Sequence, residues 1–161
     1  MSLGDRLRRV MGLPESVDPA SARSAALEAA IAAGDAAAAR AAALAYVQAQ
    51  AFGDALAALA MLEERLPAQR AEWLRWQGQL LYINLSFHAP DPATRLECLT
   101  RALDCYFEAA ALGDLSQSFN VLEICDALAD EPALSAEQKR EIARRYRALF
   151  LTSDLPAPGA R

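Results

Sequence analysis

The chain has 161 residues, 54% of them hydrophobic, and a formal net charge of −5. This length is typical of one domain with a buried core. The negative charge argues against nucleic acid as a partner, because phosphate binding needs a concentrated basic surface. No stretch approaches the ~18 apolar residues of a membrane span, and no apolar segment follows the N-terminal arginines as in a secretory signal. We therefore expect a cytoplasmic protein without stable membrane insertion. The preference for Arg over Lys is typical of a GC-rich bacterial genome, so we also expect a bacterial protein.

Residues 1–17 are expected to hold an amphipathic helix and a linker. Leu3, Leu7 and Val10 share one helical face, and three arginines accompany them. Three roles are open for this segment. It can cap the first helical repeat, touch an anionic membrane, or occupy a groove of its own chain or of a neighbour.

Residues 18–152 form the predicted main domain, in which apolar residues recur at helical spacing and alternating strand patterns are absent. Pro and Gly divide this domain into further helices. Their predicted ranges are about 19–33, 36–51, 55–66, 67–88, 92–112, 115–129 and 135–151. Residues 153–161 contain prolines and no apolar periodicity, so we expect a disordered tail. The predicted fold class is all-α.

A Gly-Asp dipeptide recurs between the alanine-rich helical stretches. It occurs at Gly34-Asp35, Gly53-Asp54 and Gly113-Asp114. Glycine can adopt the left-handed conformation that ends a helix, and Asp can cap the first amides of the next helix. The dipeptide therefore predicts tight corners between helices that follow one another. Predicted helix starts at Asp18, Asp54 and Asp91 lie 36 and 37 residues apart, which is the length of a helix-turn-helix repeat.

The segment 49–67 resembles the second half of a tetratricopeptide repeat (TPR). After its Gly-Asp corner come the small Ala58, the large Leu62 and then Pro67, in the order that this family uses. The segment 106–114 is similar to the same corner, or to that of the related Sel1-like repeats. The resemblance implies a TPR-like right-handed α-solenoid of about seven to eight antiparallel helices, an architecture that binds other proteins.

The sequence carries none of the common catalytic motifs. It lacks a phosphate-binding glycine loop, His-Glu-x-x-His, Cys-x-x-Cys and Gly-x-Ser-x-Gly. His88, the only histidine, is expected to lie at a helix end near backbone carbonyls. Cys98, Cys105 and Cys125 are expected to be buried, reduced thiols. We therefore expect a protein that is not an enzyme and that holds no cofactor or metal.

The predicted helix 67–88 contains both tryptophans and is apolar on two faces. One face carries Trp73, Trp76, Leu80, Ile83 and Phe87, and the other carries Leu74, Leu81 and Leu85. Such a helix is expected to be buried on two sides, or to line a groove for a partner helix or an extended peptide. Amide and arginine side chains can hold the backbone or a carboxylate of that peptide. The candidate partner-binding residues are Trp73, Arg75, Gln77, Asn84, Gln117 and Asn120.

Charge is distributed unevenly near the end of the predicted domain. Residues 114–131 carry five acids and no base, whereas residues 136–147 carry an excess of bases. We expect the two neighbouring helices to attract each other through these charges.

Three functions agree with these features. The first is a cytoplasmic adaptor that captures a helix or an extended peptide of another protein in a concave groove. The second is a secretion chaperone of the type III translocator class, because small acidic chains with three such repeats resemble these chaperones. The third is a small-molecule or metal-binding helical protein that uses His88, Cys98 and a pocket beneath the Pro-rich loop 89–92. Assembly into a homo-oligomer stays open, because the ends of solenoids often stack on copies of themselves.

Overall fold

The structure is a computed structural model that describes residues 19–151. Within this range the chain is all-helical and contains no strand. Its α-helices are α2 (Pro19–Ala33), α3 (Ala36–Gln48), α4 (Phe52–Arg65), α5 (Arg70–Gln79), α6 (Pro92–Ala111), α7 (Ser118–Ala129) and α8 (Ala136–Tyr146). A short 3-10 helix, Pro67–Gln69, precedes α5, and π-helical stretches at Leu80–Leu85 and Arg147–Leu151 continue α5 and α8. The predicted helix at 2–11 and the predicted tail at 153–161 lie outside the described residues.

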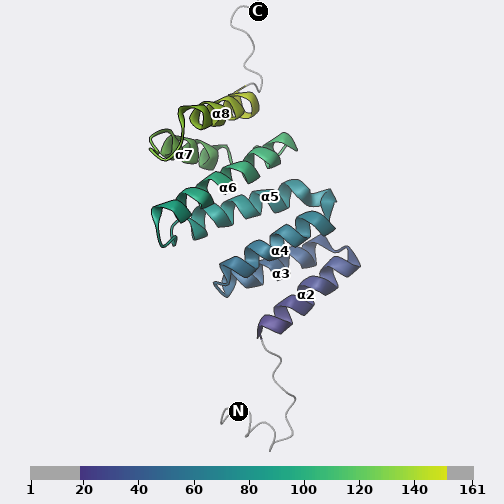
Figure 1. Cartoon of the computed structure of the whole chain (residues 1–161). Coiled ribbons are helices and arrows are strands. Elements are labelled where there is room, and N and C mark those ends of the chain that lie inside the picture. The colour runs from purple at the N-terminus through teal and green to yellow at the C-terminus, as the bar shows by residue number, and fades with distance from the viewer. Residues whose placement is uncertain (1–18, 152–161) are drawn as a thin grey trace, which may run out of the picture.

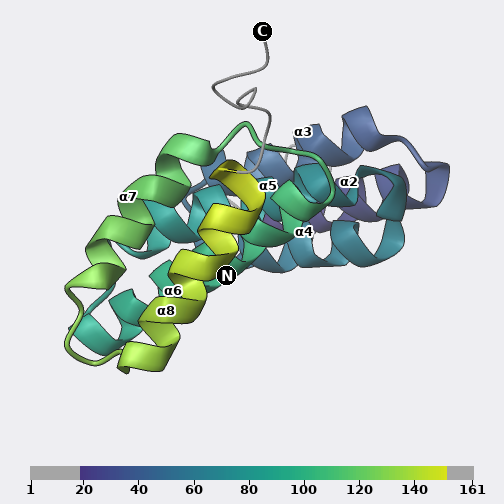
Figure 2. The ribbon, with the colours of Figure 1, turned by 90° about the horizontal axis from the view of Figure 1, so that it is seen from above.

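The helices are stacked in the order of the sequence. Each helix from α2 to α8 packs against the next one, and the stack begins with α2 at one end and ends with α8 at the other (Figure 1). Viewed from above, α6, α7 and α8 extend to one side of α2, α3 and α4 (Figure 2). Alanine-rich helices favour this arrangement, because their small side chains let neighbouring backbones approach closely.

The helix formed by α5 and its π-helical continuation is buried on two sides, as the sequence predicts. Trp73 and Leu80 belong to a core that also contains Leu27 and Leu59 from the N-terminal half. Leu81, the next residue, belongs to a second core. The other buried members of that second core are Leu99, Ala102, Leu103, Tyr106, Phe107, Val121, Ile124 and Leu128. Consecutive residues of one helix therefore enter different cores, and α5 joins the two halves of the stack.

The three Gly-Asp steps behave differently in the structure. At the first, Gly34 has a φ of +65°, and the Asp35 side chain accepts hydrogen bonds from the amides of Ala37 and Ala38. The predicted corner is confirmed there. At the third, Gly113 is left-handed with a φ of +96°, but α7 begins only at Ser118. The carboxylate beside Gly113 therefore caps a turn before α7, and not α7 itself.

The expected corner at Gly53 is wrong, because Gly53 lies inside the first turn of α4. The left-handed residue between α3 and α4 is Gln50, with a φ of +57°. The amide of Ala51 then donates to the carbonyl of Tyr46 over 3.0 Å, which is the hydrogen bond that closes a helix C-terminus in this way. The turn thus occurs three residues before the glycine, and Gln50 adopts a conformation that glycine would adopt without strain.

We predict that Gln50→Gly raises the free energy of unfolding by about 0.5–1 kcal/mol. A residue with a side chain is strained in the left-handed conformation, and the substitution removes this strain. The gain is reduced, because glycine has more conformational entropy to lose when the chain folds. Gly34→Gln is the matched control with the opposite sign, because a Cβ at Gly34 meets no atom within 4 Å and only the backbone conformation is affected. Urea unfolding of both variants tests this, and a loss of stability in Gln50→Gly would contradict it.

Two predicted helix starts are confirmed by their caps. Asp91 caps α6 by accepting the Thr94 amide, with Pro92 in the first turn. Ser135 and Gln138 form the expected capping box of α8. These polar side chains satisfy amides that have no partner inside a helix, and this explains why the boundaries could be read from the sequence.

Gly78 marks a close approach of α5 and α6. A Cβ built on Gly78 would lie 2.8 Å from Cε1 of Tyr106, whose ring is fully buried in the second core. Any side chain at position 78 would force this ring, or one of the two helices, to move.

Gly78→Ala is therefore expected to lower the free energy of unfolding by roughly 1–2 kcal/mol, because the overpacking outweighs the better helix propensity of alanine. Gly53→Ala, also in a helix, is the matched control, since its Cβ would meet nothing within 4 Å. Thermal and urea unfolding should separate the two variants, and equal stability of both would rule out the steric argument.

The π-helical stretch after α5 changes which residues face solvent. The sequence places Ile83 and Phe87 on the same face as Trp73 and Leu80, but Ile83 is 43% exposed and Phe87 is 69% exposed. A π-turn has more residues than an α-turn, so it rotates the following side chains away from the α-helical face. This finding corrects the sequence prediction for Ile83 and Phe87.

The expected charge attraction between α7 and α8 is not made by ion pairs, since none joins these two helices among residues 19–151. Arg145 of α8 instead pairs with Asp104 of α6 at 2.6 Å. Its guanidinium also lies 4.4 Å from the ring centroid of the buried Phe107. The basic helix is therefore held to α6 by one arginine that combines an ion pair with a cation–π contact.

Candidate functional site

Two of the six predicted partner-binding residues lie inside the protein. Trp73 has no exposed surface, and its indole N–H donates to the Leu66 carbonyl at 3.1 Å. Gln77 is buried, and its side-chain amide donates to Glu63 at 2.9 Å. Both side chains hold α5 against α4 and are not available to a partner. We therefore leave Trp73 and Gln77 out of the candidate site and correct the sequence-based choice of these two residues.

Arg75 and Asn84 line a pocket between α3 and α5, which we call the α3–α5 pocket. Its volume is about 290 Å³. Its lining residues are Leu44, Val47, Leu59, Arg75, Trp76, Gln79, Leu80 and Asn84. The walls are mostly apolar, and the guanidinium of Arg75 and the side-chain amides of Gln79 and Asn84 supply hydrogen-bond donors. Arg75 and Asn84 are among the residues predicted from the sequence. This mixture is typical of sites that take an apolar group and orient it by a few polar contacts.

The α3 side of the pocket was missed by the sequence analysis, although a signal for it exists. In this alanine-rich helix, Arg40, Leu44 and Val47 follow helical spacing and therefore share one face. Leu44 is 40% exposed, which is high for a leucine on a helix that packs on two neighbours. The face shared by Arg40, Leu44 and Val47 is thus the one that meets α5.

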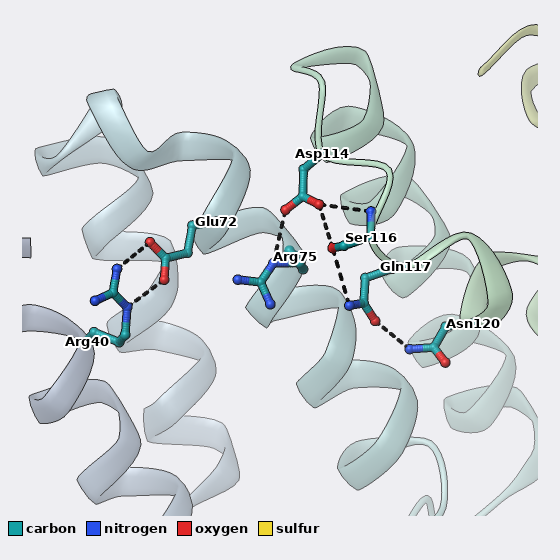
Figure 3. A network of polar contacts seen from close by, with 7 residues as sticks. All are labelled: Arg40, Glu72, Arg75, Asp114, Ser116, Gln117 and Asn120. Carbon is teal, nitrogen blue, oxygen red and sulfur yellow. Dashed lines mark hydrogen bonds and ion pairs between the residues drawn. The ribbon is translucent and has the colours of Figure 1, made fainter. Parts of the chain in front are cut away.

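Ion pairs join α5 to its neighbours on two sides (Figure 3). On the α3 side, Nε and one terminal nitrogen of Arg40 donate to the two carboxylate oxygens of Glu72 at 2.6 and 2.7 Å. On the other side, Nε of Arg75 lies 3.0 Å from Asp114, in the turn before α7. This turn continues into Gln117, which accepts a 2.7 Å hydrogen bond from Asn120. Gln117 and Asn120 are therefore close to each other, but neither lines the α3–α5 pocket.

The carboxylates of Glu72 and Asp114 both favour the ionised form. The hydrogen bonds from Arg40 lower the pKa of Glu72 below its usual range, against a smaller opposing effect of burial. For Asp114, burial raises the pKa, but hydrogen bonds from Ser116 and the charge of Arg75 together outweigh burial, so that the net pKa is lowered. The positive charges of Arg40 and Arg75 are thus balanced by these carboxylates, and the pocket has little net charge to attract an ion.

A buried hydroxyl lies beneath Asn120. Tyr106 is 1% exposed, and its buried hydroxyl makes no hydrogen bond within residues 19–151. Burial raises the pKa of Tyr106, and the nearby Asn120 amide opposes this effect only in part. This neutral phenol packs against Gly78 as part of the core and supplies no acid–base group to the surface.

The features expected for a metal-binding or small-molecule site do not come together. A pocket of about 340 Å³ lies beside the loop 89–92, as predicted, but neither His88 nor Cys98 lines it. His88 contacts the Asn84 carbonyl through Nδ1 at 2.6 Å. Between residues 19 and 151, no group of three or more His, Cys, Asp or Glu side chains is arranged to hold a metal ion.

All three cysteines are free and half-buried. Burial raises the pKa of the Cys98 thiol, raises that of Cys105 to about 12 and raises that of Cys125 to about 11. Thiols with such pKa values are neutral at physiological pH and react slowly as nucleophiles.

Comparison of the chain with known protein families, with curated proteins and with solved structures gives no match in any of the three. The candidate function therefore rests on the residues described above. In the described part of the chain, no helix combines the length and the apolar character that crossing a membrane requires.

Glu72→Gln is expected to lower the free energy of unfolding at pH 7 by about 0.5–1 kcal/mol, because it removes the carboxylate that pairs with Arg40. The pKa of Glu72 is lower in the folded protein than its ordinary value of 4.5. The stabilisation is therefore fully present above pH 4.5 and is lost as the pH falls through the lowered pKa. Urea unfolding at a series of pH values measures this.

Glu97→Gln is the control for this prediction, because Glu97 and its partner Arg101 are 3.7 Å apart and largely exposed. Its effect should stay below about 0.5 kcal/mol at every pH. A difference between wild type and Glu72→Gln that does not shrink at low pH would show that the ion pair is not its cause.

Proposed function

We propose that this protein is a non-catalytic adaptor that binds a helix or an extended peptide of another protein on the face formed by α3, α5 and α7. The proposal includes a TPR-like right-handed α-solenoid as the architecture and the bacterial cytoplasm as the place of action. The observation that carries it is the α3–α5 pocket, where apolar walls and the polar side chains of Arg75, Gln79 and Asn84 face the same space.

The direction of the helices supports a repeat architecture. Arg40, early in α3, pairs with Glu72, early in α5. Leu44 and Val47, later in α3, share the pocket with Leu80 and Asn84, later along α5 and its continuation. Residue numbers therefore increase in the same direction along both helices, although α4 lies between them in the chain. Alternate helices that run in the same direction are what a stack of helical hairpins requires.

The same relation extends from α5 to α7. Arg75 pairs with Asp114, just before α7, and the Tyr82 hydroxyl donates to Glu123, in the middle of α7, at 2.8 Å. The helices α3, α5 and α7 thus share one side of the stack. In helical-repeat proteins such a row of helices forms an extended binding surface.

The pocket fits a peptide better than it fits a charged small molecule. Leu44 and Trp76 offer apolar surface to one side chain of a partner segment, as anchors in grooves for helices and peptides do. The side-chain amides of Gln79 and Asn84 make no hydrogen bond within residues 19–151. They can therefore bind the partner's backbone. Arg75 uses Nε for Asp114, and its terminal nitrogens are available for a carbonyl or carboxylate oxygen.

We predict that peptides selected from a phage-displayed library against the intact protein lose affinity roughly tenfold or more when Leu44→Asp or Asn84→Ala is introduced. Leu44 is 40% exposed, so this change should leave the fold intact. Fluorescence anisotropy with a labelled selected peptide measures the affinities, and thermal unfolding verifies that each variant is folded.

Leu112→Asp is the matched control, because Leu112 is 51% exposed and lies at the end of α6, outside the pocket. Selected peptides should bind this variant like wild type. Peptides that bind Leu44→Asp and Asn84→Ala with unchanged affinity, or a library that yields no binding peptide, would refute the α3–α5 pocket as the binding site.

A further inference from the structure

Helix α7 presents a second apolar surface to solvent. Its buried side carries Val121, Ile124 and Leu128, which belong to the second core. Phe119 and Leu122 lie on the opposite side of the helix, where they are 68% and 41% exposed. Single apolar side chains are common on protein surfaces, whereas large ones within one turn of each other indicate a contact surface. We call Phe119 and Leu122 the α7 stripe.

The α7 stripe lies beside the α3–α5 pocket. The hydrogen bond from Tyr82 to Glu123 fixes the register of α7 against α5. Phe119 precedes Glu123 by four residues, and Gln79 precedes Tyr82 by three. Because α5 and α7 run in the same direction, Phe119 and Gln79 lie at about the same level. Gln79 lines the pocket, so apolar surface continues across the three helices from Leu44 on α3 to Phe119 on α7.

The unpaired charges on α7 beside the stripe are acidic. Glu123 and Asp126 follow Phe119 by one and two turns, and both are exposed. Neither forms an ion pair within residues 19–151, whereas the arginines of α3 and α5 on this side are already paired. One base from another helix, Arg95, lies near the end of α7, and it lines the loop pocket together with Glu131. The pocket is thus close to neutral, and α7 adds negative charge at one side of it.

We propose that the partner of the adaptor is a cationic segment that crosses α3, α5 and α7. One apolar side chain of the segment enters the α3–α5 pocket, a second covers the α7 stripe, and Lys or Arg side chains next to the second face Glu123 and Asp126. This inference rests on the proposed function and specifies the chemistry of the partner at the same face. The same face of a second copy carries the same acids, and it would be repelled.

The helix spacing sets the length of the partner segment. Neighbouring helix axes lie about 8–10 Å apart, so the two steps from α3 to α7 amount to about 16–20 Å. An extended chain advances about 3.3 Å per residue, and about six residues therefore join the two anchors. We expect a recognition motif of two apolar residues at roughly this separation, with bases near one of them.

The peptides that a phage-displayed library yields against the intact wild-type protein test this inference. Their sequences should contain more Lys and Arg than Asp and Glu. Phe119→Ser should weaken a labelled selected peptide roughly tenfold in fluorescence anisotropy, as the loss of an aromatic anchor does. Leu151→Ser is the matched control, because Leu151 is 60% exposed and lies after α8, away from this face. Thermal unfolding verifies that both variants are folded.

A charge reversal tests the acidic half of the surface. Asp126→Lys should weaken the same peptide roughly tenfold at low ionic strength, and by less at high salt, where exposed charges are screened. Glu64→Lys, at an exposed position of α4, makes the same change in net charge outside the face of α3, α5 and α7. It should leave the affinity unchanged, so the pair separates a local contact from an effect of total charge.

The outcomes distinguish this inference from the proposed function. Peptides that lose affinity in Leu44→Asp but bind Phe119→Ser and Asp126→Lys like wild type would overturn it and leave the adaptor function in place. Selected peptides without an excess of bases would overturn it in the same way. A library that yields no binding peptide would refute the adaptor function and this inference together. A dimer in sedimentation velocity that Phe119→Ser dissociates would assign the α7 stripe to a second copy and also overturn the inference.

Discussion

The structure depends on one helix that is buried on both sides. α5 and its π-helical continuation supply Trp73 and Leu80 to one core and Leu81 to the other. Neither half of the stack could be completed without this helix, because each core lacks a wall when α5 is removed. Truncating a buried tryptophan such as Trp73 to alanine costs roughly 3–5 kcal/mol, so a strong constraint on the fold coincides with the helix that lines the candidate site.

This double burial also explains the polar contacts around α5. A helix that contributes its apolar residues to two cores has only narrow strips left for polar side chains, and those strips meet α3 on one side and the turn before α7 on the other. Glu72 and Arg75 occupy the strips and are paired across both boundaries. Because these partly exposed charges neutralise each other, we expect any selectivity at the α3–α5 pocket to come from shape and from amide hydrogen bonds more than from net charge.

The π-helical stretch links the fold to the exposed surface. Within one turn it changes which side chains are buried, so that Leu81 enters a core while Ile83 and Phe87 face solvent. Two backbone carbonyls of this stretch are also contacted by side chains: the Ser86 hydroxyl donates to the Tyr82 carbonyl, and the His88 ring contacts the Asn84 carbonyl. The only histidine of the chain therefore has a structural role at a helix end, as expected from its place in the sequence.

The sequence by itself determined the features that depend on neighbours in the chain. Helix positions, the caps at Asp35, Asp91 and Ser135, and the two apolar faces around Trp73 could be predicted because helical spacing and capping involve only a few consecutive residues. Tertiary structure alone decided which side chains are available to a partner. Trp73 and Gln77 are buried by α4, Gln50 is forced into the left-handed corner, and the π-turn exposes Phe87. The burial of Trp73 and Gln77 depends on contacts with a second helix, and periodicity within one helix carries no information about such contacts.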